Sequence, residues 1–436
     1  MYFTLDVLRA RKGDCLILHY GSKDDPHLML IDGGPSNVYK PHLKPRIVQI
    51  REGRGLENNE PLPVDVVMVS HVDDDHIKGI LDLTREQRGK NPDVRLKVTS
   101  LWHNSFDDLL TTKPDQLATA GFTASLGGGG GGGSEVFDSG SVLAGFGKAA
   151  LAAGDVGSEE EMQTLEVLSS IPQGRTLRDD AKALGWKVNH KFKGMLILAD
   201  KASKPVTLDG LTITVAGPMK PELLALQKEH DKWLCAQKKK KKKSSEAALA
   251  AFVDKSIPNL SSIVVLAEMK KKSILLTGDA RGDKILEGMK LSGMLEKGKR
   301  HVDILKVPHH GSDNNMETGF FEKVTADHYV FSGDGEHGNP ERATLEMLLD
   351  ARGTDAEYTI HLTYPVAEID KERKADWAKE QGKEKKRKKK KVRPNWSAAA
   401  HSLASFFEKN PEFAEKVVIV DKAKPHLIDL LEPLEP

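Results

Sequence analysis

The stretch PVDVVMVSHVDDDH, residues 63–76, decides how the rest of the chain is interpreted. Residues 63–70 form a short apolar and β-branched run that begins at a proline, which is typical of a buried strand. Four candidate metal ligands follow at its end: His71, Asp73, Asp75 and His76. Acidic loops are common, but histidines that bracket one directly after a buried strand are much rarer. The stretch therefore predicts a metal site, with a solvated structural loop as the alternative.

Further strand patterns lie on both sides of this stretch. Strands are expected at residues 3–8, 15–20, 27–31, 97–103, 195–198, 211–215, 261–268, 273–277, 302–307, 329–332, 358–362 and 416–420. Helices are expected at residues 341–351 and near residues 397–409. Many short strands with helices between them predict a layered α/β fold.

Two segments interrupt the pattern, and both are rich in one residue type. One contains seven consecutive glycines, 127–133, and the other a run of six lysines, 238–243. A glycine run is expensive to order, which is typical of a mobile insertion. The expected organisation is core at 1–104, glycine-rich insertion at 105–193, core strands at 194–220, lysine-rich helical insertion at 221–256, core at 257–365, and a lysine-rich loop with a helix–strand extension at 366–436.

The composition limits the protein class only in part. Lys plus Arg (65) and Asp plus Glu (64) nearly cancel, so net charge says nothing about partners. Two distant cysteines, Cys15 and Cys235, argue against a disulfide scaffold and suit a reducing compartment. The start has no signal-peptide pattern, and no run approaches the ~18 apolar residues of a membrane span. We expect a cytoplasmic protein without a membrane partner.

The ordered set of motifs resembles the metallo-β-lactamase superfamily, and within it the ComEC-type hydrolases. The His-x-Asp-x-Asp-His pattern at 71–76 is the ComEC-type form of the superfamily motif. The other matching features are Gly13-Asp14, Asp32-Gly33-Gly34, Asn259, Thr277-Gly278-Asp279 and residues 305–312. The resemblance covers residues 1–103 and about 195–350, and it implies a four-layer αββα sandwich with insertions and a site for two divalent metal ions.

The resemblance also implies roles for single residues. His71 and Asp73 would hold one metal, Asp75 and His76 the other, and Asp279 would bridge both. One histidine of the pair His309 and His310 would complete the set, and the sequence leaves open which. Asp32 would support the ligands or be purely structural, while His103 is a possible ligand or a satisfied surface histidine. Asn339 replaces the family's histidine before a proline, so His337 becomes the candidate proton donor and, with Asp75, the catalytic candidate.

This ligand set suits hydrolysis of a phosphodiester. Two cations about 3.5–4 Å apart activate a water and clamp the attacking and leaving oxygens. Oxygen-rich sites favour manganese, with zinc as the alternative. His337, His103 or a metal-bound water would protonate the leaving oxygen.

The substrate predicted by the motif set is nucleic acid, with DNA favoured. The candidate contacts are Lys306, Lys388, Lys389, Lys390 and Arg393, although such charge runs are also typical of solvated loops. One alternative is a hydrolase of a cyclic nucleotide, lactone or thioester. Another is a non-catalytic metal- or nucleic-acid-binding subunit of a defence complex, with a protein partner in a multi-component system.

Overall fold

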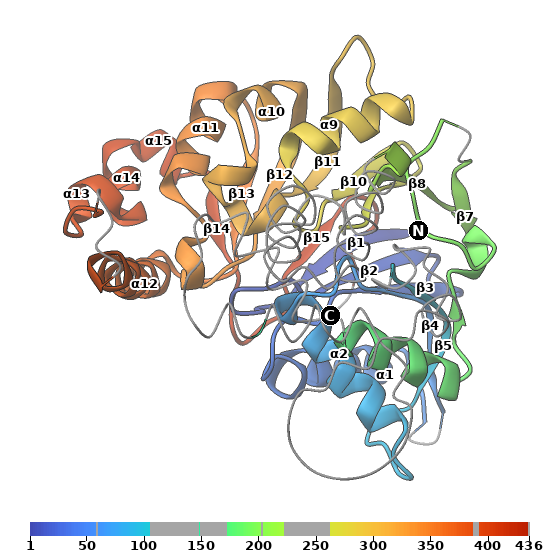
Figure 1. The fold of residues 1–436 in the computed structure, drawn as a ribbon. Helices are drawn as coiled ribbons and strands as arrows, with labels where there is room; N and C mark the ends of the chain where they lie inside the picture. Colours follow the sequence, from blue (N-terminus) through green and yellow to red (C-terminus); the bar gives the residue numbers. More distant parts are fainter. Residues whose placement is uncertain are drawn as a thin grey trace, which may run out of the picture.

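The computed structural model describes residues 1–57, 60–104, 148, 172–201, 204–221, 262–386 and 392–434. Within them the chain forms two large mixed β-sheets that pack face to face, with helices on both outer sides (Figure 1). The predicted layered α/β sandwich is confirmed.

The first sheet has seven strands and contains the motif strand. Its order is β15 (Leu427–Asp429), β1 (Tyr2–Val7), β2 (Leu16–Gly21), β3 (Pro26–Ile31), β4 (Leu62–Met68), β5 (Leu96–Trp102) and β6 (Lys187–Val188). The strands from β15 to β3 are antiparallel, and those from β3 to β6 are parallel. Strand β6 lies in the range expected to be the glycine-rich insertion, so the end of that range belongs to the core sheet.

The second sheet has eight strands. Its order is β14 (Val417–Ile419), β13 (Thr359–Leu362), β12 (Val324–Phe331), β11 (Arg300–Lys306), β10 (Lys272–Leu276), β9 (Val264–Met269), β8 (Leu211–Gly217) and β7 (Val206–Leu208). Strands β10 to β14 run parallel, and the expected hairpin β9–β10 is present. Residues 195–198, expected to be a strand, form none; only Ala199 makes an isolated bridge to Met219.

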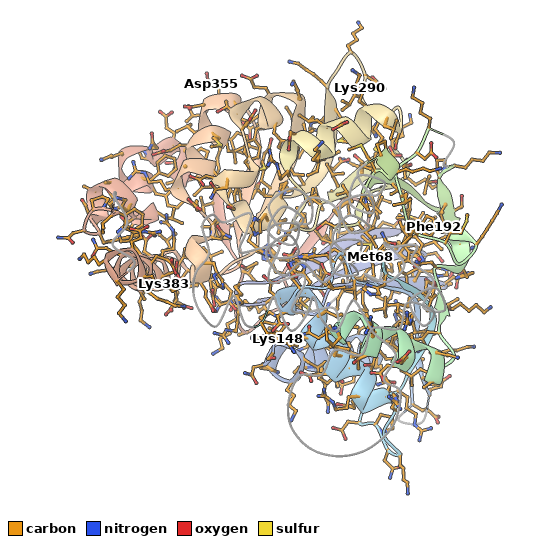
Figure 2. All side chains as sticks on the ribbon, viewed as in Figure 1. Met68, Lys148, Phe192, Lys290, Asp355 and Lys383 are labelled. Carbon is orange, nitrogen blue, oxygen red and sulfur yellow. The ribbon has the colours of Figure 1, made fainter. Side chains whose placement is uncertain are left out.

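Three apolar clusters hold the layers together. The central cluster lies between the sheets and includes Leu5, Met68 and Ile304. Figure 2 shows Met68 in the interior, at the end of the motif strand. Alternate residues of β1 enter this cluster, as expected for a strand with one face on the core.

The two outer clusters join helices to the sheets. Helices α1 (Lys44–Gly53) and α2 (Asp74–Gln87) cover the first sheet. Helices α9 (Gly282–Leu291), α10 (Thr318–Lys323) and α11 (Arg342–Arg352) cover the second. Helix α2 buries Ile77, Ile80 and Leu81 at helical spacing, so its apolar stripe fixes the motif loop that precedes it.

The C-terminal extension returns to the core. It contains α12 (Val366–Lys386), α13 (Ala398–His401), α14 (Leu403–Lys409) and α15 (Pro411–Ala414) before β14 and β15. The helix expected near residues 397–409 is split at Ser402, whose hydroxyl accepts a hydrogen bond from Ser405 N and so caps α14. No described helix has the length and apolar character needed to cross a membrane. The expected lysine-rich helical insertion lies almost wholly outside the described residues.

Candidate metal centre

The candidate residues meet at one end of the sandwich, where parallel strands finish. The carboxyl ends of such strands are the usual place for a site in α/β proteins. Each of five strands delivers polar residues there: Asp32 after β3, residues 70–76 after β4, His103 after β5, Asp279 after β10 and residues 309–310 after β11.

Asp279 occupies the middle of the group. Its Oδ1 lies 3.3 Å from His76 Nε2 and 3.4 Å from His310 Nε2. Its Oδ2 lies 3.7 Å from His71 Nε2 and 3.6 Å from His309 Nε2. The two oxygens of one carboxylate therefore face two different pairs of imidazoles.

The remaining carboxylates follow this division in part, since Asp75 can also be grouped with His71 and His76 as possible ligands of one ion. Asp73 Oδ2 lies 3.4 Å from His71 Nε2. Asp75 Oδ1 lies 3.8 Å from His76 Nε2, and its Oδ2 lies 3.8 Å from His310 Nε2. We name the two groups by their members: group 1 is His71, Asp73 and His309, and group 2 is Asp75, His76 and His310. The sequence left open which histidine of the pair 309–310 joins the site, and the structure brings both to Asp279.

The imidazoles of group 2 are oriented by hydrogen bonds on their far sides. His76 Nδ1 lies 2.9 Å from Asp32 Oδ2, and His310 Nδ1 lies 3.1 Å from Ser332 Oγ. With Nδ1 as the donor, each Nε2 keeps a lone pair directed at the centre, the arrangement found in metal-binding histidines. In the described part of the chain, His76 Nε2 and His310 Nε2 are buried without a hydrogen-bond partner, as is Asp73 Oδ1. Such atoms are costly to bury, so these side chains fit a bound cation.

Asp32 lies behind the candidate ligands, on the Nδ1 side of His76. Its two oxygens accept hydrogen bonds of 2.7 Å from the backbone N and the hydroxyl of Ser70, in addition to the bond with His76. The next residue, Gly33, touches α2 so closely that a Cβ there would lie 2.4 Å from Ile80 N. Only glycine fits there, because the turn after β3 packs directly on the helix that carries the motif.

Asp14 is a part of the centre that the sequence did not assign. Its Oδ2 lies 2.5 Å from Lys306 Nζ, and its Oδ1 lies 3.4 Å from His310 Nδ1 and accepts a hydrogen bond from Ser332. It can be grouped with His76, Asp279 and His310 as a possible ligand. Both of its oxygens are already engaged on the Nδ1 side of His310, so we place it behind the ligands.

Lys306 corrects an expectation. It was expected to contact nucleic acid, but its side chain is 1% exposed. Its ammonium also lies 3.3 Å from the carbonyl oxygen of Gly278, beside Asp279. Because a buried and paired ammonium cannot reach a polyanion, that expectation is wrong.

The buried carboxylates and imidazoles of the centre shift one another's pKa values. Burial raises the pKa of the Asp279 carboxyl, but the imidazoles of His310, His76 and His309 outweigh it and hold that pKa well below its usual range. Burial lowers the pKa of His310, yet the carboxylates of Asp279 and Asp14 raise it to about 9. Protons on His76 and His310, whose pKa values are raised, compensate the carboxylates, and a cation binding at the centre would displace them.

His103 lies at the end of β5, fully buried. Within the described ranges both of its ring nitrogens lack a hydrogen-bond partner, and it joins none of the groups suited to a metal. Burial, helped by the charge of Arg178, lowers its pKa to about 4. It is not the satisfied surface histidine of the alternative interpretation, and whether it is a ligand stays a prediction.

His337 lies at the rim. Its Nε2 is 2.8 Å from Lys12 Nζ, and burial together with that ammonium lowers its pKa to about 4. The carboxylate of Asp75 also acts on this pKa. His337 is therefore a neutral imidazole near the centre. From the sequence alone, only the family resemblance suggested that it lies there.

The expected basic contacts in the tail lie mostly outside the described residues, including Lys388, Lys389 and Lys390. Arg393 is described, and its Nε lies 3.1 Å from Glu384 Oε1 while its guanidinium stacks 5.0 Å from the Trp377 ring centre. Figure 2 shows Lys383 at the outer edge of the molecule, on α12. Arg393 is thus fixed to α12, close to where the lysine tract begins.

Comparison with known proteins gives little further information. No family model matches the chain. A segment of 53 residues, 12% of this chain, is 40% identical to microtubule-associated protein 1A of Rattus norvegicus, Mus musculus and Homo sapiens, but it spans only 2% of that protein's length. A protein of unknown function from Enterococcus faecalis V583 aligns over 84% of this chain and 71% of its own, with 11% identity and a TM-score of 0.26. The functional argument therefore rests on the site itself.

Proposed function

We propose that this protein is a two-metal hydrolase that cleaves phosphodiester bonds of nucleic acid, with DNA favoured. The observation that supports it most is the position of Asp279, whose two oxygens face separate groups of imidazoles and carboxylates. A carboxylate in that position is suited to bridge two cations. A single-ion site has no need of four imidazoles around both oxygens.

Manganese is the proposed metal, and zinc is the alternative. Asp75 and Asp279, with Asp73 beside His71, would supply the hard oxygen donors that manganese prefers, whereas the imidazoles suit zinc as well. A pair of divalent ions would supply an activated water and offset the negative charge of the phosphate. The chain's own part is to fix that geometry: Asp32 orients His76, while Asp14 and Ser332 orient His310.

Proton transfer to the leaving oxygen is proposed for the rim. His337 has a neutral imidazole and receives a hydrogen bond from Lys12, which leaves its other nitrogen as a donor. Asp75, the other catalytic candidate, acts electrostatically on this ring. We propose His337 as the residue that donates a hydrogen bond to the leaving group.

The experiment compares substrates and metals on one preparation. Metal-free protein is reconstituted with manganese, magnesium or zinc, then incubated with single- and double-stranded DNA, RNA, cyclic nucleotides, lactones and thioesters. Asp279→Asn should abolish cleavage. Asp283→Asn, an exposed carboxylate on α9, is the matched control and should keep it.

Nucleic-acid cleavage that depends on Asp279 supports the proposal. Fast turnover of a lactone, thioester or cyclic nucleotide with no nucleic-acid cleavage in any metal would overturn it. Tight metal binding without any turnover would favour the non-catalytic subunit instead.

A further inference from the structure

The turn that carries His337 has an uncommon backbone. His337 has φ 60° and ψ 14°, and Gly335 and Gly338 on either side of it also have positive φ. A residue with a side chain is strained in this left-handed region, so it persists only where the surroundings hold it. Gly338 N donates to Gly335 O over 3.1 Å, and Gly335 N donates to Asn339 O over 2.9 Å. These two bonds close the turn, but neither ties it to another element.

Helix α12 supports the turn from outside. A Cβ added to Gly335 would lie 2.2 Å from Ile369 O, so only glycine lets the turn pack this closely on the helix. One helical turn further along, Arg373 Nε donates a hydrogen bond of 2.9 Å to Gly338 O. The helix therefore holds the turn just before and just after His337.

Arg373 is itself fixed. Its side chain is 8% exposed, and its Nη1 donates to His401 O over 2.7 Å and lies 3.3 Å from Asp370 Oδ1. Its guanidinium lies 5.7 Å from the Trp396 ring centre. Burial lowers the pKa of Arg373, while the carboxylates of Asp370 and Glu341 act against that shift. A buried guanidinium with partners on several sides has little freedom, so it can set the position of the turn that it contacts.

We propose that Arg373 is a positioning residue, which holds Gly338 so that His337 keeps the orientation needed to donate to the leaving oxygen. The inference rests on the proposed function, because it takes His337 as the donor. It also gives the C-terminal extension a part in the reaction, since α12 and the carbonyl of His401 both belong to that extension.

The first test compares two phosphodiesters that differ in their leaving group. A thymidine dinucleotide releases an alkoxide, which needs a proton, whereas the p-nitrophenyl ester of thymidine monophosphate releases a phenolate that is stable without one. In metal-loaded protein, Arg373→Gln should lower kcat for the dinucleotide about 10–100-fold, as expected for a misplaced proton donor. The kcat for the nitrophenyl ester and the KM of both substrates should change little. His337→Gln should show the same difference between the substrates.

The second test asks whether Arg373 acts through His337. The double variant Arg373→Gln with His337→Gln should cleave the dinucleotide no more slowly than His337→Gln alone, because the donor is already absent. A third measurement does not depend on activity. In protein with isotope-labelled histidine, the NMR signal that disappears in His337→Gln should move in Arg373→Gln. The signal of the exposed His301 should stay in place.

Two further variants separate positioning from structural damage. Arg352→Gln is the matched control, because Arg352 Nη1 also donates to a backbone carbonyl, Ala326 O over 3.1 Å, and its guanidinium lies 5.2 Å from the Tyr358 ring centre. It should change neither substrate. Arg373→Lys keeps a charge near Asp370 but lacks the planar fork that reaches both carbonyls. It replaces Arg373→Gln if that variant does not fold, and it should show the same difference between the substrates.

Equal losses on both substrates, an unmoved His337 signal, or a double variant slower than His337→Gln would overturn the inference. If the dinucleotide is cleaved with the dependence on His337 described above but Arg373→Gln behaves normally, the inference fails and the proposed function stands. If the His337 signal moves in Arg373→Gln but the unaltered protein cleaves neither phosphodiester, the link from Arg373 to His337 stands and the proposed function fails.

Discussion

Three histidines form a hydrogen-bonded row between the sheets, away from the metal centre, and their chemistry predicts acid sensitivity. His361 Nε2 lies 3.0 Å from His328 Nδ1, and its Nδ1 lies 2.8 Å from His426 Nε2. Each link needs one N–H and one lone pair, which three neutral rings supply when all donate in the same direction along the row. A proton on His361 would place a charge in a buried position beside the other two imidazoles.

The size of the effect follows from the pKa of His361. Burial, followed by the neighbouring His426 and His328, lowers that pKa from 6.5 to about 3. Burial also lowers the pKa of His328, which faces Asp327, Asp303 and Lys272, and of His426, which faces Asp6.

A lowered histidine pKa means that the folded state binds fewer protons than the unfolded chain. The part of the free energy of unfolding that depends on a neutral His361 is therefore complete above pH 6.5 and is lost as pH falls toward 3. At pH 5 the loss from His361 alone is about 2 kcal/mol, since one pH unit corresponds to about 1.36 kcal/mol.

Urea unfolding at pH 7.5 and pH 5.0 measures this loss. The protein is kept metal-free with a chelator, so that metal release does not contribute. Between pH 7.5 and pH 5.0 the free energy of unfolding should fall about 2 kcal/mol more in the unaltered protein than in His361→Gln, because the variant has no histidine to protonate at this position. His301→Gln, which removes an exposed histidine from β11, should retain the full fall. If His361→Gln shows the same pH dependence as the unaltered protein, the neutral histidine row is not the cause.

Three further predictions concern the metal centre. After metal saturation and desalting, elemental analysis should give two ions per chain, and Asp279→Asn should retain fewer than one, because each group loses its shared oxygen; two ions in the variant would refute the bridging position. Asp32→Ala should lower metal affinity about 10–100-fold, because His76 loses its orienting partner, and unchanged affinity in a metal titration would count against that role. Lys306→Met should lower the free energy of unfolding by about 3–5 kcal/mol, because it leaves Asp14 buried without its cation, and adding Asp14→Asn should recover most of the loss. If Lys306→Met is as stable as the unaltered protein and only binds DNA more weakly, Lys306 contacts DNA, as the sequence suggested.

The sequence predicted the motif loop because its members are adjacent and follow a strand with a clear apolar pattern. Most strands around it could be predicted for the same reason. The link from Asp14 to Lys306 could not, since these residues are distant in sequence and a lysine at the end of a strand is usually exposed. Helix α12 has no apolar stripe in its sequence, and the three residues of β15 are too few to form a pattern. Their positions are set by tertiary contacts.

The pairing of β1 with β15 affects the synthesis of the chain. Strand β1 ends at Val7 and strand β15 begins at Leu427, so these paired strands are 420 positions apart in the sequence. At about 5–20 residues per second, the edge of β1 stays unpaired for about 20–80 seconds after it leaves the ribosome. An unpaired edge can pair with strands of other nascent chains, so this interval exposes the protein to aggregation. A premature stop that removes β15 would make the exposure permanent, and such fragments should collect in aggregates that grow from the edge of β1.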